Sequence, residues 1–95
     1  MAHYFSAQIR IKDPEEYERY LGNFDEIFSG HKGEILAVDE SPTVVEGRWN
    51  YTKSVLIRFP SREDFEDWYF SKDYQQILKY RLNAAECDSI LIEGY

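Results

Sequence analysis

Two arginines occupy positions where the sequence predicts apolar, buried neighbours. Arg58 lies inside the apolar run "SVLIRF", and Arg81 lies on the apolar stripe of a predicted helix. Guanidinium groups are rarely buried unless they are paired, and their planar donors suit two-point recognition of a carboxylate. Either arginine could therefore bind the anionic group of a small ligand. The other interpretation is structural: an internal ion pair with Asp39, Glu46 or another carboxylate.

Three aromatic residues are further candidates for a ligand site. Trp68 and Tyr74 flank a predicted break between two helical segments, where they could wall an apolar pocket. Aromatic residues at helical spacing also form ordinary core, so packing is the competing interpretation. Trp49 falls in a predicted loop, where a pocket lid and a contact between two copies are both consistent with the sequence.

Asp39 ends a predicted strand and has two interpretations. Its carboxylate could act as a base or orient Arg58, or it could form the turn ahead of "ESP". The histidines, His3 and His31, and the lone Cys87 offer no metal-ligand spacing, and no site for a metal is expected. Neither a glycine-rich phosphate loop nor a serine nucleophile elbow is present, so the sequence predicts no bound cofactor.

The composition limits the partners of the chain. It has 95 residues and a formal net charge of -7, so a nucleic-acid backbone would be repelled. No apolar run approaches the ~20 residues that span a bilayer. The first residues lack the pattern of a signal peptide, and a single cysteine suits a reducing compartment. We expect one domain over residues 1–95, located in the cytoplasm, with neither nucleic acid nor membrane as a partner.

Alternation and helical spacing place the elements that must position these residues. Residues 3–12 alternate apolar and polar side chains, as a strand with one buried face does. Asp13 and Pro14 then begin a helix, and capping serines at 61 and 71 begin two more. Further strands are predicted over residues 34–39, 43–47, 54–59 and 89–94, the second of these being short.

The resulting order, β-α-β-β-α-β with the second helical region broken in two, is that of an α+β, ferredoxin-like fold. In this fold an antiparallel sheet carries its helices on one face. The sequence predicts these residues on the helix side: Phe5, Ala7, Ile9, Ile11, Val55, Ile57, Phe59, Ile90 and Ile92. The other face would carry Tyr4, Ser6, Gln8, Arg10, Ser54, Leu56, Arg58 and Leu91. Since this second face mixes apolar with polar groups, we expect a second sheet to cover it.

Several segments together resemble the DUF1330 family of the dimeric α/β-barrel superfamily. They are "YFSAQIRIKDPEEYERYL", "GEILAVDESPTVVEGRW", "VLIRFPSREDFEDWYFSKDYQQILKYR" and "ILIEG", which cover nearly the whole chain. The resemblance implies a ferredoxin-like protomer and a homodimer formed sheet to sheet. The superfamily includes cofactor-independent monooxygenases, lactone isomerases, haem-degrading enzymes and stress-response proteins, and fold alone does not choose among them.

Two functions follow from these residues. The first is a homodimer that binds a small anionic or aromatic molecule, with cofactor-free isomerisation or oxygenation as its chemistry if it is an enzyme. The second is a non-catalytic dimer for sensing or protein interaction, whose arginines are structural. A haem-handling protein ranks behind both, because it would need an axial histidine and the chain has only His3 and His31.

Overall fold

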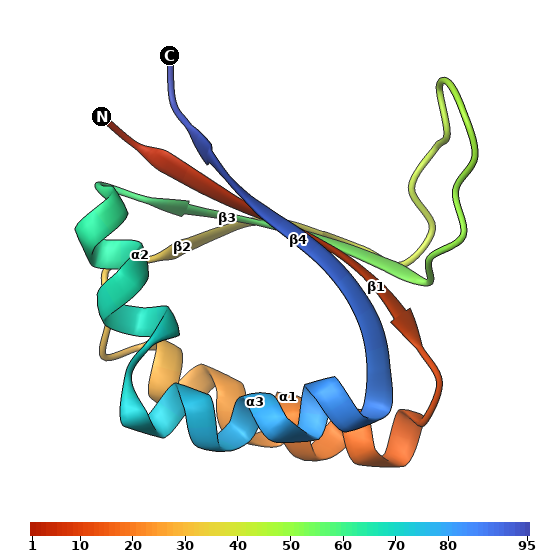
Figure 1. Cartoon of the computed structure of the whole chain (residues 1–95), viewed down its shortest axis with the longest axis horizontal. Helices are drawn as coiled ribbons and strands as arrows, with labels where there is room; N and C mark the ends of the chain where they lie inside the picture. The colour runs from red at the N-terminus through yellow and green to blue at the C-terminus, as the bar shows by residue number, and fades with distance from the viewer.

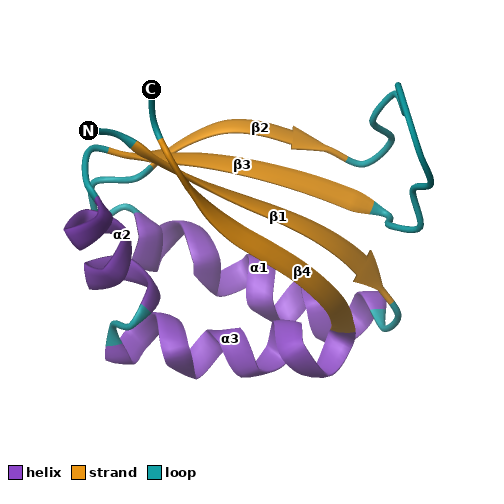
Figure 2. Cartoon of the chain, turned by 45° about the horizontal axis from the view of Figure 1, so that its top comes forward, coloured by secondary structure: helices purple, strands orange, loops and turns teal.

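A computed structural model describes residues 1–95 as one sheet layer packed against one helix layer (Figure 1). The sheet has four antiparallel strands in the order β2-β3-β1-β4, with three helices on one face (Figure 2). This confirms the predicted α+β, ferredoxin-like arrangement. The elements in chain order are β1 (His3–Ile11), α1 (Pro14–Phe28), β2 (Glu34–Asp39), β3 (Lys53–Phe59), α2 (Arg62–Tyr69), α3 (Lys72–Ala84) and β4 (Ala85–Glu93).

Each helix begins at a side chain that caps it, as the sequence predicts. The Glu16 amide donates to Oδ1 of Asp13 at 3.2 Å, and Pro14 occupies the first turn of α1. Ser61 caps α2 in the same way, since its Oγ accepts from the Asp64 amide at 3.1 Å. Ser71 begins α3, and this cap separates α3 from α2 so that the two helices run in different directions over the sheet (Figure 2).

Strand register decides which side chains meet the helices. On β1, the residues Phe5, Ala7 and Ile9 are buried beneath the helices, as predicted. The prediction for β4 was wrong: Phe5 pairs with Leu91, so Leu91 packs on the helix side and Ile90 points to the open face. Because "ILI" is apolar throughout, alternation within β4 does not show which of these residues face the helices. The pairing with β1 decides it.

The segment between β2 and β3 also differs from its prediction. Residues 43–47, expected to form a short strand, belong to a long loop that projects away from the sheet (Figure 1). No strand pairs with this segment, and Val45 is 88% exposed. Two hydrogen bonds hold the end of the loop against the sheet: the Arg10 guanidinium donates to the Asn50 carbonyl at 2.6 Å, and the Tyr51 hydroxyl donates to Asp88 at 2.6 Å. β-branched residues alone do not make a strand where no partner edge is available.

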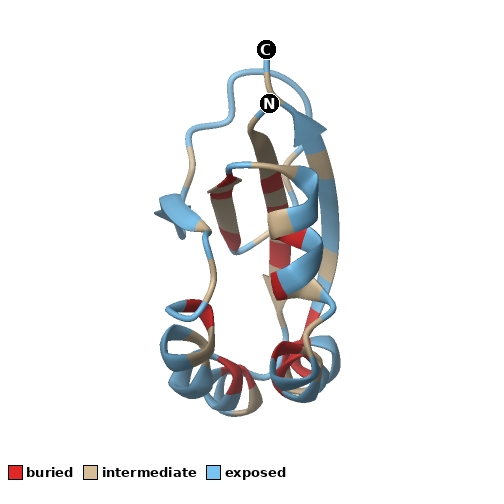
Figure 3. Ribbon diagram, turned by 90° about the vertical axis from the view of Figure 1, so that its left-hand side faces the viewer, coloured by how far each residue is buried: buried red, intermediate tan, exposed pale blue.

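The core lies between the two layers, and Figure 3 shows the buried segments on the central strands and on the inner sides of the helices. Aromatic rings dominate it. Trp68 is fully buried, with its ring centre 5.5 Å from that of Phe59 and 4.2 Å from that of Tyr74. No helix of the structure has the length and apolar character needed to cross a membrane.

Gly33, which precedes β2, lies so close to two buried rings that any side chain there should destabilise the fold. A Cβ placed there would lie 2.5 Å from Cζ of Phe28 and 2.7 Å from Cε1 of Phe59, both in buried rings. Overpacking of this kind costs about 1–3 kcal/mol, so Gly33→Ala should lower the free energy of unfolding by that amount in urea denaturation. Gly30→Ala is the control, because its new Cβ would meet only the Ile27 carbonyl oxygen at 3.6 Å. Equal stability of the two variants would contradict the packing described here.

Candidate functional site

A cavity of about 220 Å³ lies between the inner face of the sheet and helix α1. Fifteen residues from all three helices and from β1, β2 and β3 line it, and twelve of these are hydrophobic. The other three are Asp25, Lys53 and Arg81. Leu21 and Asp25 on α1, with Ile35 and Val38 on β2, are exposed and form its mouth at the edge of the sheet. An apolar cavity with a few polar groups is the usual composition of a small-molecule site.

Arg81 is buried in this cavity without a carboxylate partner. The side chain sits in the last turn of α3, three residues after Leu78 on the stripe that packs inward, and is 3% exposed. Arg81 forms none of the ion pairs in the structure, and its Nε has no hydrogen-bond acceptor. Its guanidinium carbon lies 5.6 Å from the ring centre of Tyr20. Aromatic contacts therefore replace the internal ion pair that the structural interpretation required.

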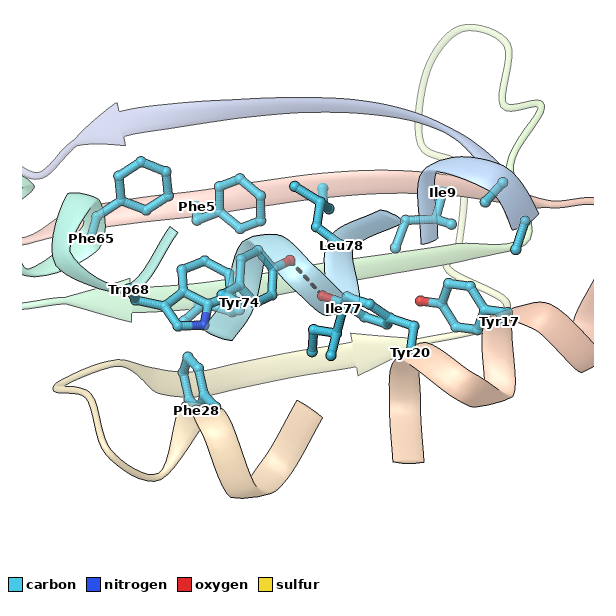
Figure 4. Close-up of a cluster of buried hydrophobic side chains, with 14 of the residues drawn as sticks. Phe5, Ile9, Tyr17, Tyr20, Phe28, Phe65, Trp68, Tyr74, Ile77 and Leu78 are labelled. Carbon is cyan, nitrogen blue, oxygen red and sulfur yellow. Dashed lines mark hydrogen bonds between the residues drawn. The ribbon is translucent and has the colours of Figure 1, made fainter. Parts of the chain in front are cut away.

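Two buried phenols lie beside Arg81. The hydroxyls of Tyr20, from α1, and Tyr74, from α3, are 2.6 Å apart and join the two helices (Figure 4). Burial raises the pKa of both phenols, so both keep their protons at neutral pH. In such a pair one hydroxyl donates its hydrogen to the oxygen of the other. The hydroxyl that accepts keeps its own hydrogen, which it can donate to a further acceptor. The pair can thus offer one hydrogen bond to an oxygen atom of a ligand.

Lys53 is the second buried cation of the cavity. It is the first residue of β3, is 8% exposed, and its ammonium group forms no ion pair. Its Nζ lies 4.9 Å from the ring centre of Tyr17. Burial lowers the pKa of Lys53, against the opposing effect of the Glu40 and Glu18 carboxylates, and raises the pKa of Tyr17 to about 12. An amine in this setting is both an anion partner and a latent nucleophile.

The predicted site residues fall into two groups. Trp68 and Arg81 line the cavity, and Tyr74 reaches it through the hydroxyl of Tyr20. Arg58 lies on the opposite face of the sheet, as predicted, where it pairs in register with Tyr4 and Glu34 and forms no ion pair.

Asp39 and Trp49 also lie outside the cavity. Asp39 accepts a hydrogen bond from the Ser41 amide at 2.8 Å, which is the contact of a turn former. The pairing register places Asp39 and Arg58 at opposite ends of the β2–β3 ladder, so Asp39 cannot orient Arg58. Trp49 packs edge-on against Tyr51 in the projecting loop, and Tyr51 donates to Oδ2 of Asp88 at 2.6 Å.

The sequence interpretation missed Lys53, although its signal was present. Strand alternation places Lys53 on the same face as Val55, Ile57 and Phe59, which were assigned to the helix side. Lysine at the start of a strand is ordinarily solvated, so only the cover provided by α1 shows that this side chain is enclosed. The structure gathers no set of three or more histidine, cysteine, aspartate or glutamate side chains suited to a metal ion.

Comparison with known proteins gives a family and a fold. The model of a family described as "Domain of unknown function (DUF1330)" matches residues 2–95. Among solved structures, a protein of unknown function from Rhodopseudomonas palustris has a TM-score of 0.82 at 15% identity, over 99% of this chain and 82% of that one. A dimeric ferredoxin-like protein of unknown function from Thermobifida fusca has a TM-score of 0.68 at 13% identity, over 99% and 92%.

A third solved structure has a described activity. SnoaB, a cofactor-independent oxygenase from Streptomyces nogalater, has a TM-score of 0.67 at 12% identity, over 99% of this chain and 93% of that one. At such identities the likeness establishes the fold alone. No protein with a curated functional description matches the sequence.

Proposed function

Since the chain belongs to the DUF1330 family, a family defined by a domain of unknown function, we propose a function from the site itself. The protein binds a small aromatic anion in the cavity between its sheet and its helices. The observation that carries this proposal is Arg81: a permanent charge, 3% exposed, without a carboxylate partner, on the wall of an aromatic cavity. Burying an unpaired cation costs several kcal/mol, and an anionic ligand would offset that cost.

The size of the cavity favours a single-ring ligand. Its volume of about 220 Å³ lies below the roughly 300–1,000 Å³ of sites for drug-sized molecules. A cavity of about 150 Å³ holds benzene, so one ring with a carboxylate and a small substituent fits. The carboxylate would accept hydrogen bonds from Arg81 and from the Tyr20–Tyr74 pair, while the ring would pack among Phe5, Phe24 and Trp68.

Any turnover in this cavity would be cofactor-free isomerisation or oxygenation. The chain would supply orientation, the charges of Arg81 and Lys53, and an apolar enclosure that excludes water. SnoaB, which shares the fold, is described as a cofactor-independent oxygenase, and this supports the same class of chemistry here.

The open face of the sheet supports a homodimer. Ile90 and Ile92 are 58% and 45% exposed there, and Arg58 lies on the same face without a partner. A second copy packed sheet to sheet would cover this apolar surface and close a dimeric barrel. The solved relative from Thermobifida fusca is described as dimeric. The free, lone Cys87 suits a reducing compartment, which supports a cytoplasmic location.

A thermal-shift series tests the binding proposal. Benzoate, phenylacetate and 4-hydroxybenzoate are compared with benzamide and benzyl alcohol, which match them in size but carry no charge. A ligand at 100 times its Kd adds about 2.7 kcal/mol to the free energy of unfolding, which a domain of this size shows as a rise of several degrees in Tm. We expect the rise with the acids alone. An equal rise with the amide, or no rise with any acid, would refute the proposal and favour the non-catalytic interaction dimer.

A further inference from the structure

We propose that Lys53 forms a covalent imine with an aromatic aldehyde or keto acid held in the cavity, with Arg81 binding the carboxylate of that ligand. This inference rests on the proposed function, since it requires an aromatic acid to occupy the cavity. It adds a reaction, a nucleophile and a narrower ligand class, namely acids that also carry a carbonyl group.

The placement of the amine is the first support. Lys53 is 8% exposed on the wall of the cavity, and its Nζ lies over the Tyr17 ring at 4.9 Å from the ring centre. It forms no ion pair, so no carboxylate must be displaced before the amine can react. Tyr17 is followed on α1 by Tyr20, whose ring lies under the Arg81 guanidinium. The two cations thus lie over neighbouring rings. This spacing allows one small ligand to contact both Lys53 and Arg81.

The surroundings of Lys53 shift its amine toward the neutral, nucleophilic form. Enclosure beneath α1 lowers its pKa. The charged groups that face it are the carboxylates of Glu18 on α1 and Glu40 after β2, which oppose this shift, and the Arg81 cation across the cavity. Both glutamates are exposed, so water and salt weaken their effect. A bound carboxylate would be neutralised by Arg81, leaving the amine free to attack.

The reaction balances without an added oxidant or reductant. The Nζ lone pair attacks the carbonyl carbon of the ligand, and a C–N bond forms to give a carbinolamine. The carbonyl oxygen then leaves as water with both amine hydrogens, and a C=N bond remains. Hydrolysis reverses each step. A lysine that is desolvated in an apolar pocket is an established way of activating an amine for this chemistry.

The other lysines of the chain lack this setting. Lys12 and Lys32 are exposed and pair with Glu86 and Asp64, and Lys72 and Lys79 are exposed on α3. Their amines lie in water outside the cavity, so no bound ligand is held against them and any imine that they form should be sparse and short-lived. Among the lysines, Lys53 should therefore be modified selectively.

Reductive trapping tests the inference. The protein is treated with 4-carboxybenzaldehyde and cyanoborohydride at neutral pH, and its intact mass and its peptides are measured. We expect one dominant lysine adduct, heavier by the mass of the aldehyde less one oxygen atom, on Lys53. Lys53→Met should lose this adduct, whereas Lys79→Met should keep it. Benzaldehyde, which lacks the carboxylate, should label Lys53 at least tenfold more slowly than 4-carboxybenzaldehyde, and Arg81→Met should abolish that difference.

The controls separate the two proposals. Lys79→Met lies outside the cavity, so both its rise in Tm with benzoate and its Lys53 adduct should match wild type. Lys53→Arg cannot form the imine, and it replaces Lys53→Met if the methionine variant does not fold. A rise in Tm with benzoate, together with labelling spread over surface lysines or unchanged labelling in Lys53→Arg, would overturn the imine while leaving the binding proposal intact. Absence of both the rise and the Lys53 adduct would overturn both proposals.

Discussion

Arg81→Met is expected to remove the affinity for small aromatic carboxylates while leaving the free energy of unfolding unchanged or higher. The guanidinium is buried without a carboxylate, so its replacement by an apolar side chain of similar length relieves a desolvation cost. A ligand carboxylate would lose two charge-assisted hydrogen bonds worth about 1.5–3 kcal/mol each in a buried site. Kd for benzoate should rise by about 10²- to 10⁴-fold in titration calorimetry.

Arg58→Met is the matched control for this experiment. It makes the same chemical change on the opposite face of the sheet, where Arg58 pairs in register with Tyr4. Benzoate affinity should stay within about twofold of wild type, because no ligand in the cavity meets this side chain. Loss of affinity in Arg58→Met with full affinity in Arg81→Met would move the anion site to the open face. A large fall in stability for Arg81→Met would instead show that Arg81 is structural.

Trp68→Ala should be the most destabilising single substitution among those considered. Trp68 is fully buried, and its ring centre lies within 5.6 Å of those of Phe28, Phe59 and Tyr74. Removing a buried tryptophan costs about 3–5 kcal/mol through lost transfer energy and a new cavity. This is a large share of the ~5–15 kcal/mol that stabilises a domain. Urea denaturation followed by circular dichroism measures the change.

Phe70→Ala provides the comparison for Trp68→Ala. Phe70 lies two residues further along, at the end of α2, but is 65% exposed. Its truncation should change the free energy of unfolding by no more than about 0.5 kcal/mol, as surface substitutions usually do. A cost below about 1.5 kcal/mol for Trp68→Ala would mean that the space it fills can collapse, which would contradict the packing described for the aromatic core.

Most of the fold could be predicted from local patterns in the sequence. The caps at Asp13, Ser61 and Ser71 and the alternation of β1 could be identified because each depends on residues adjacent in the sequence. The phase of β4 could not, since Ile90, Leu91 and Ile92 are equally apolar and only pairing with β1 distinguishes them. The prediction of a strand over residues 43–47 was wrong for a related reason. A strand requires a neighbouring strand to pair with, and the sequence of the segment does not reveal whether one is present.

The candidate site was only partly accessible from the sequence. Helical spacing put Arg81 on the inward stripe of α3, and Trp68 and Tyr74 flanked the helix break beside it. That Arg81 would lack a carboxylate could not be anticipated in a chain with 18 acidic residues. The absence of a partner depends on where the folded chain puts those residues, and none of them reaches the guanidinium. The burial of Lys53 could not be predicted, because it depends on α1 rather than on the neighbours of Lys53 in β3.

The carboxylate of Asp25 at the mouth of the cavity bears on how fast a ligand arrives. An approaching anion meets Asp25 and a chain of net charge -7 before it reaches either buried cation. This long-range repulsion slows encounter, and salt screens it over a Debye length of about 8 Å at physiological ionic strength. The association rate constant should therefore increase with ionic strength, whereas the lifetime of the bound state, set by enclosed contacts with Arg81, should change little. Asp25 should therefore lower the rate at which anions enter the cavity while having little effect on how long they stay bound.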